Sequence, residues 1–162
     1  MPAAPQASRP HMPGYGIKAA TEGKGLMPWS WARQRLSQAR VYWLSTVRPS
    51  GAPHCMPVWG IWHDDALIFS TGSQSQKARN LAANPVCTIA AGEDDEAVVV
   101  EGKAELVNDD GLWPIFADSY KEKYSFDMSA MKSEPVYVFR PTKAFGLTTG
   151  LADSATRWTF EH

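Results

Sequence analysis

The fold is decided by the segment VYWLSTVRPSGAPHCMPVWGIW, which runs from Val41 to Trp62. Its first part, Val41–Val47, is rich in β-branched and aromatic residues and predicts a strand. The residues Pro49–Ala52 have the composition of a turn, and His54–Trp62 predicts a second strand. A third strand is expected at Ala66–Thr71. Three strands with short turns between them indicate an antiparallel meander.

The rest of the chain continues this pattern, with many strands and few helices. Further strands are expected at Val86–Ala91, Ala97–Val107, Val136–Phe139, Ala144–Thr148 and Thr156–Phe160. Helices are expected at Trp29–Gln38, Ser73–Ala83 and Leu112–Tyr124. This order predicts a mainly β, α+β protein: an antiparallel barrel with short flanking helices, not a βαβ sheet.

Length and composition set the outer limits. The 162 residues fit one domain, which we expect at 28–162, preceded by an extended Pro- and Gly-rich arm at 1–27. The net charge of −1 provides no broad basic field for nucleic acid or an anionic membrane. The N-terminal region has no long apolar run, so neither a signal peptide nor a membrane span is expected. Two cysteines are too few for a disulfide scaffold, which favours a reducing, cytoplasmic location.

The segment FSTGSQSQKARN, from Phe69 to Asn80, carries the clearest chemical signal. A strand ends in hydroxyl residues, a glycine permits a turn, and a helix follows whose N-terminus attracts phosphate. At about 100° per residue, Ser73, Lys77 and Asn80 fall within an arc of about 60° on that helix. Lys77 is therefore the candidate for a phosphate contact, whereas Arg79 lies nearly opposite. An ordinary solvated helix with a serine cap remains an alternative explanation.

Two other segments have unusual composition. Pro57 removes a donor from its strand and Gly60 permits close approach, so this strand can face a planar ligand or can be simply a bent barrel strand. Near the C-terminal end, Arg157 and Trp158 can pair with an anion and stack on a ring, or Trp158 can be buried in an edge strand.

Other motifs are discounted. The histidines and cysteines share no spacing typical of a metal site, so none is expected. No nucleophile elbow is present. Tyr42, His54 and Tyr124 are able to donate a proton, but a structural role explains each of them, and no catalytic residue is assigned.

Taken together, several segments resemble the pyridoxamine 5′-phosphate oxidase-like superfamily. The resemblance rests on Val41–Val47 followed by Gly51–His54, on Pro57–Gly60, Phe69–Thr71 and Ser75–Leu81, on Val100–Ala104 and on the terminal Thr156–Trp158. It spans about Trp29 to Phe160, and it is strongest for the flavin/deazaflavin-dependent oxidoreductase branch. It implies a split β-barrel homodimer with two cofactor sites at the subunit interface.

The resemblance also implies roles for individual residues. The strand around Met56, Pro57, Val58 and Trp59 would line the cofactor ring. The phosphate and ribityl side would be held by Ser70, Thr71, Lys77 and Asn80, in addition to Ser73 from the helix argument. Arg157 and Trp158 would approach the cofactor from the other subunit. The form of the Lys77–Asn80 and Thr156–Trp158 motifs is nearer to the coenzyme F420 branch than to the FMN branch.

The leading functional hypothesis is therefore a reductase that uses F420, or alternatively FMN, to transfer a hydride to a small unsaturated organic substrate. A second hypothesis is a non-catalytic carrier of flavin, deazaflavin or haem, for which His54 would be the first haem ligand to test. A third is an interaction protein whose aromatic surface serves only dimerisation.

Overall fold

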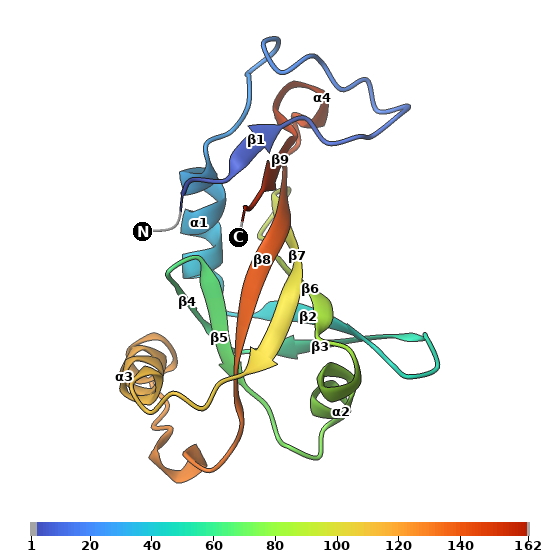
Figure 1. Cartoon of the computed structure of the whole chain (residues 1–162). Coiled ribbons are helices and arrows are strands. Elements are labelled where there is room, and N and C mark those ends of the chain that lie inside the picture. Colours follow the sequence, from blue (N-terminus) through green and yellow to red (C-terminus); the bar gives the residue numbers. More distant parts are fainter. Residues whose placement is uncertain (1–2, 162) are drawn as a thin grey trace.

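The meander begins with strand β2 (Tyr42–Val47), which pairs on its two sides with β3 (Pro53–Val58) and β6 (Val86–Ala91). In the computed structural model, which describes residues 3–161, all nine strands belong to one sheet with the order β1-β9-β8-β7-β6-β2-β3 along its main path (Figure 1). The remaining strands are β1 (Gln6–Ser8), β4 (Ile61–His63), β5 (Ala66–Ser70), β7 (Ala97–Leu106), β8 (Val136–Leu147) and β9 (Thr156–Thr159). All pairings are antiparallel.

The second predicted strand is in fact two strands. The chain leaves β3 after Val58, and after Trp59 and Gly60 it starts β4, which pairs with β5 instead of β2. Gly60 lies so close to β5 that an added Cβ would be 2.7 Å from Leu67 Cδ1 and 3.0 Å from the Ile68 carbonyl oxygen. The glycine therefore permits the close crossing at which one strand ends and the next begins.

Conversely, the strands predicted at Val136–Phe139 and Ala144–Thr148 are parts of one continuous strand, β8. One side of β8 pairs with β7, while the other pairs with β5 through Val136–Phe139 and with β9 through Lys143–Gly146. The change of partner on one side of a continuous strand makes the barrel split. This confirms the predicted fold class of a mainly β split barrel with short flanking helices.

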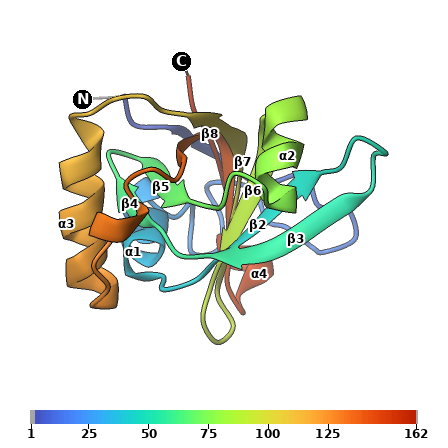
Figure 2. The same cartoon turned by 90° about the horizontal axis from the view of Figure 1, so that it is seen from below.

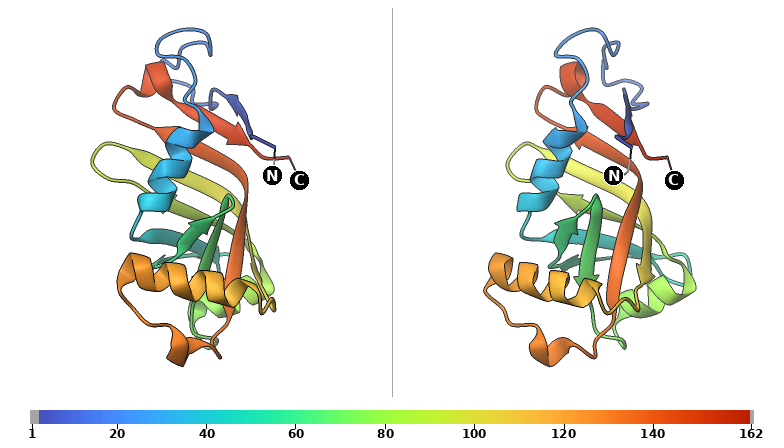
Figure 3. Two further views of the ribbon diagram at one scale, coloured as in Figure 1. Left: turned by 90° about the vertical axis from the view of Figure 1, so that its left-hand side faces the viewer. Right: turned by 60° about the vertical axis from the view of Figure 1, so that its left-hand side comes forward.

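The helices cover different parts of this sheet (Figures 2 and 3). Helix α1 (Trp29–Gln38) buries Trp29, Ala32 and Leu36 in the main core, and α3 (Leu112–Tyr124) covers a second core beside β4 and β5. Both follow the predicted bounds. Short helices are also present at α4 (Leu151–Ser154) and at the 3-10 turn η1 (Ser129–Met131).

Helix α2 (Gln76–Ala83) starts later than predicted. Its N-cap is Ser75, whose hydroxyl accepts a hydrogen bond of 3.1 Å from the backbone N–H of Ala78. Ser73 lies in the preceding turn, where the Ser75 N–H donates to the Gly72 carbonyl at 2.9 Å. The expectation that Ser73 shares a helix face with Lys77 is therefore wrong, because Ser73 is outside the helix.

The N-terminal segment is fixed to the barrel. Strand β1 pairs with β9, and the Arg9 guanidinium donates hydrogen bonds to the carbonyls of Asp153 at 2.8 Å, Ala155 at 3.0 Å and Glu22 at 3.0 Å. None of the helices within residues 3–161 has the length and apolar character needed to cross a membrane.

Candidate functional site

Three basic side chains lie near enough for their charges to interact where α2 approaches the β2–β3 hairpin. Lys77 lies in the first turn of α2, His54 on β3, and Arg48 in the turn between β2 and β3. Partial burial and the nearby positive charges of Arg48 and Lys77 lower the pKa of His54 below its ordinary value. Within residues 3–161, no carboxylate forms an ion pair with any of the three side chains, and His54 Nδ1 has no hydrogen-bond partner. Such a cluster favours an anion as its ligand.

The N-terminus of α2 adds backbone donors to this cluster. Ser75 caps the helix, and its hydroxyl shares a hydrogen bond of 3.2 Å with the hydroxyl of Thr71. The Ser70 hydroxyl donates at 2.7 Å to the Pro135 carbonyl, which ties the end of β5 to the start of β8. Ser73 is exposed in the turn before the helix. Ser70 thus lies at the end of β5, and Thr71 and Ser73 lie in the turn that leads to Lys77; the predicted phosphate contact of these hydroxyls stays a prediction.

Asn80 has a different environment from the one expected. Its side chain is fully buried: Nδ2 donates to Thr46 Oγ1 at 3.0 Å, and Oδ1 accepts from Gln76 Nε2 at 2.7 Å. Its amide is therefore occupied within the protein, and we correct its assignment from ligand contact to structural support of α2.

Strand β3 provides an open edge beside this cluster. Within residues 3–161, β3 pairs only with β2, so one edge of its backbone has no strand partner (Figure 2). Met56 is 46% exposed and Pro57 is exposed, whereas the Val58 side chain is buried. Free backbone donors and acceptors beside apolar side chains suit the polar edge of a flat ring.

Trp59 extends this surface and is held from behind by α3. Its ring stacks on Tyr124 at 4.7 Å between centroids with an interplanar angle of 4°, yet 46% of the residue stays exposed. The Gly60 N–H donates to the Tyr124 hydroxyl at 3.0 Å, and the Lys123 ammonium donates to the Gly60 carbonyl at 2.9 Å. The end of α3 therefore fixes the segment that follows β3.

The two tyrosines considered as proton donors are both engaged in this arrangement. The buried Tyr42 hydroxyl donates to the Leu36 carbonyl at 2.5 Å, and burial raises its pKa far above the ordinary value. Burial likewise raises the pKa of Tyr124. Both hydroxyls support the fold.

Trp158 lies in the main core of the barrel. It is fully buried, its ring centroid is 5.4 Å from that of Trp29, and its indole N–H donates to the Met27 carbonyl at 3.2 Å. A ring without exposed surface is unable to contact a cofactor in another subunit, so this expectation is corrected.

Arg157, the neighbour of Trp158 on β9, points to the sheet face opposite to that of Trp158. Its Nε donates to the Ser8 hydroxyl at 3.1 Å. In the antiparallel pairing of β9 with β8, Arg157 lies directly opposite Phe145. The register continues this row on one face through Ser8, Arg157, Phe145, Val99, Ala90, Trp43 and Pro57. Trp43 in this row is 50% exposed, and Val47 on the same strand face is 36% exposed. The row connects Arg157 with the strand that carries the predicted ring contacts.

Sequence reasoning missed Arg48. The turn composition of Pro49–Ala52 was the available signal, because a tight hairpin brings the residue before it close to the start of the returning strand. Within residues 3–161, no group of three or more His, Cys, Asp or Glu side chains is arranged to hold a metal ion.

Comparisons with known proteins agree with this architecture. The family model described as pyridoxamine 5′-phosphate oxidase matches residues 31–147. A search of curated protein sequences gave no match. Among solved structures, a conserved hypothetical protein from Mycobacterium tuberculosis has 20% identity and a TM-score of 0.70, with 82% of this chain and 89% of that chain covered.

Two further structures belong to proteins with a described function. A protein described as an F420 reductase has 27% identity and a TM-score of 0.58, with 69% of this chain and 94% of that chain covered. The haem storage protein HutZ from Vibrio cholerae has 18% identity and a TM-score of 0.59, with 70% of this chain and 87% of that chain covered. The M. tuberculosis protein and HutZ, each below 25% identity, share the fold with this chain.

Proposed function

The chain belongs to the pyridoxamine 5′-phosphate oxidase family, and from this membership we propose that it binds a flavin-type cofactor, coenzyme F420 or FMN, and reduces a small unsaturated organic substrate. The observation that carries this proposal is the group of Lys77, His54 and Arg48 beside the open edge of β3. Among the described residues these three basic side chains have no carboxylate partner in an ion pair, and a bound phosphate would be their anionic partner.

The protein's own groups divide the binding task. Lys77 and the N-terminus of α2 would hold the phosphate, with hydroxyls from Thr71 and Ser73 around the preceding turn. The Ser70 hydroxyl, whose proton is donated to the Pro135 carbonyl, would support the end of β5 instead. The ring would lie along Met56, Pro57, Val58 and Trp59, where the β3 edge offers backbone hydrogen bonds. Trp59 is held by Tyr124, so this wall is rigid before the ligand arrives.

When bound, the cofactor would supply the hydride chemistry. The protein would orient the ring and keep water away from one of its faces, and neither role requires an acid–base pair. This agrees with the structural roles of Tyr42 and Tyr124.

We also propose a homodimer formed through the face that contains Trp43, Phe145 and Arg157. Half-exposed apolar side chains form part of this face, and Arg157 would reach the anionic part of the cofactor in the other subunit. The likeness to the F420 reductase, at 27% identity, favours F420 over FMN.

The direct test is a fluorescence titration of the purified protein with F420 and with FMN, followed by transfer of reducing equivalents to an added substrate. Saturable binding of one cofactor together with substrate reduction supports the proposal. Absence of binding for both would overturn it.

A second candidate is a carrier of haem without turnover. The shared fold of HutZ and the unpartnered Nδ1 of His54 favour it. A Soret band in the purified protein that disappears in His54→Ala would support the carrier and contradict the reductase.

A further inference from the structure

The outer face of the sheet, which contains the row from Ser8 to Pro57, is divided into a basic half and an uncharged half. On β8 and β9 it carries Lys143, Arg157 and, beyond the β7–β8 bulge, Arg140. Strands β2 and β6 contain no charged residue. Strand β7 separates the two halves, with three strands on either side of it along the main path of the sheet.

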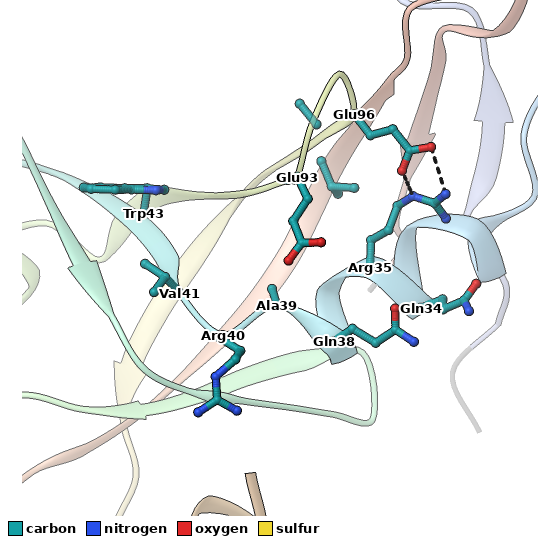
Figure 4. Close-up of a pocket in the computed structure, with 12 residues that line it drawn as sticks. Gln34, Arg35, Gln38, Ala39, Arg40, Val41, Trp43, Glu93 and Glu96 are labelled. Atoms are coloured by element: carbon teal, nitrogen blue, oxygen red, sulfur yellow. Dashed lines mark hydrogen bonds and ion pairs between the residues drawn. The ribbon is translucent and has the colours of Figure 1, made fainter. Parts of the chain in front are cut away.

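This face points away from both cores. Its residues alternate along β7 and β8 with Val100 and Ala144, which belong to the main core. The buried apolar residues of α1, α2 and α3 also belong to the two cores. On the outer face itself, Trp43 is 50% exposed, and its ring lies apart from the Arg35–Glu96 ion pair that links α1 to the turn before β7 (Figure 4). The face is therefore accessible to a partner.

Two copies of this chain can stack their outer faces in two aligned ways, which differ in the direction of the two-fold axis between the sheets. If the axis runs across the strands, each strand lies over the same strand of the partner, so the basic strands β8 and β9 face their own copies. If the axis runs along β7, the strand order is reversed, and β8 lies over the partner's β6 and β9 over the partner's β2. The second arrangement places the basic half of each subunit on the uncharged half of the other. Charge therefore favours it, because like charges are kept apart.

The sizes of the side chains in the row also fit the second arrangement. Val99 lies on the middle strand, at the axis. Beside it, Phe145 would lie over Ala90 of the partner subunit, so a large side chain meets a small one. Farther from the axis, Arg157 would lie over Trp43 of the partner subunit. The outer surfaces of two barrels curve away from each other, and these two long side chains can span the wider gap.

The contact between Arg157 and Trp43 has a specific chemistry. A guanidinium that lies on the face of an indole forms a cation–π contact, and its N–H groups stay free at the edge of the plane. Trp43 is paired with Pro57 of β3, the strand whose open edge is proposed to bind the cofactor. These N–H groups would therefore be available to an anion that is bound beside β3.

We propose that the two subunits pack β7 on β7 about a two-fold axis along this strand, and that Arg157 of each subunit stacks on Trp43 of the partner subunit. Each cofactor site then receives an arginine from the other chain. This inference rests on the proposed homodimer, and it adds the direction of the axis and the pair of residues that connects each site with the second subunit.

Cysteine cross-linking of the full-length chain distinguishes the two arrangements. All variants also carry Cys55→Ser, since the Cys55 thiol is exposed whereas Cys87 is buried. With a short bis-maleimide, Val99→Cys at the axis should give at least five times the yield of linked dimer that Trp43→Cys gives, because Trp43 lies two strands from the axis. Equal yields, or a higher yield for Trp43→Cys, would overturn the proposal, since an axis across the strands brings each residue of the row close to its own copy.

A mixture of two variants tests the pairing of Arg157 with Trp43. Trp43→Cys and Arg157→Cys chains are mixed, allowed to exchange subunits and treated with the same reagent, and intact-mass spectrometry identifies the products. The product with one chain of each kind should exceed both self-linked products at least fivefold. The control mixture of Trp43→Cys with Ala90→Cys joins two positions of the uncharged half, which lie far apart in the proposed dimer. An equal yield of mixed product in the control would overturn the pairing.

A double-mutant cycle measures the contact itself. Arg157→Gln and Trp43→Ala should each raise the dimer dissociation constant at least fivefold in sedimentation experiments, and the double variant should raise it little more than either one. The control Lys121→Gln, at an exposed position of α3, should change it less than twofold. Independent effects that multiply in the double variant would contradict a direct contact.

These measurements need neither cofactor nor turnover, so their outcome is separate from that of the proposed function. Light scattering reports whether the dimer exists, and the F420 and FMN titrations report the cofactor site. A dimer that binds cofactor but shows no preferred cross-link at Val99 would overturn the arrangement alone. The predicted cross-links in a protein that binds neither cofactor would support the arrangement and contradict the reductase.

Discussion

Asn80 Nδ2 donates a hydrogen bond of 3.0 Å to Thr46 Oγ1, and this bond joins helix α2 to strand β2 inside the protein. Asn80→Ala would leave the Thr46 hydroxyl unpaired in a buried place, which costs about 1–3 kcal/mol. We expect the free energy of unfolding, measured by urea denaturation without cofactor, to fall by this amount. Intact stability with lost cofactor affinity would instead identify Asn80 as a ligand contact.

Lys77 and Arg79 provide a matched pair of basic residues on the same helix. Lys77→Ala should weaken cofactor binding by about 1–3 kcal/mol, or roughly 5- to 150-fold in Kd, because a charge-assisted hydrogen bond to phosphate is lost. Arg79 is exposed and donates to Gln76 at 3.0 Å, so Arg79→Ala should change Kd less than twofold. Fluorescence titration measures both. Equal effects of the two substitutions would contradict the assignment of the phosphate to Lys77.

The imidazole of His54 should report on phosphate binding. In the free protein, partial burial and the charges of Arg48 and Lys77 lower its pKa. A bound phosphate anion favours the protonated imidazole and raises this pKa, so binding takes up a proton and becomes tighter as the pH falls through the titration range of His54. NMR titration of the His54 ring with and without cofactor measures the shift. A pKa that stays unchanged would place the phosphate away from this cluster.

The proposed dimer face contains Val47, which is 36% exposed. Val47→Lys would place a charge in an apolar interface, and we expect a monomer by light scattering and at least a tenfold loss of cofactor affinity. Ile115, which is 42% exposed on α3, gives the control: Ile115→Lys should leave both properties unchanged. A dimer that persists in Val47→Lys would exclude this face as the interface.

Lys123 should make stability depend on pH in the alkaline range. Burial, with a smaller contribution from Arg40, lowers its pKa to about 8, while Tyr42 and Tyr124 face the same ammonium. Between about pH 8 and 10 the unfolded chain holds a proton that the folded chain has released, so folding becomes more favourable as the pH rises. The unfolding free energy of the wild type minus that of Lys123→Met should therefore increase from pH 7.5 to 9.5 in urea titrations. A constant difference would show that the ammonium is not penalised in the folded state.

The strands and helices with strong local patterns were predictable. Val41–Val47 alternates between buried and exposed side chains, and the helix Leu112–Tyr124 has its predicted bounds. The division of the second strand at Gly60 was not predictable from the sequence. It depends on the close contact of Gly60 with Leu67 and Ile68 of β5, which a local sequence pattern does not contain. In the same way, the continuity of β8 arises from its long pairing with β7.

The candidate site was predictable where chemistry follows from local sequence. The turn before α2 leads to Lys77, as expected. Pro57, which lacks a backbone donor, lies on the edge strand β3. The orientation of the Asn80 and Trp158 side chains was not predictable, because it depends on tertiary packing. Asn80 donates to Thr46 and the Trp158 ring packs on Trp29, and both partners come from other elements of the fold. Arg48 was missed since its relation to Lys77 exists only after the hairpin docks on α2.

The pairing of β1 with β9 joins Gln6 with Thr159 and thereby closes a loop that contains almost the whole sheet. This contact has a very large sequence separation, and the entropy of closing so long a loop delays its formation. During synthesis on the ribosome, β1 has to wait for β9, the last strand of the described chain, before it finds its partner. The barrel can therefore assemble first, and the anchoring of the N-terminal segment by Arg9 becomes a late step in folding.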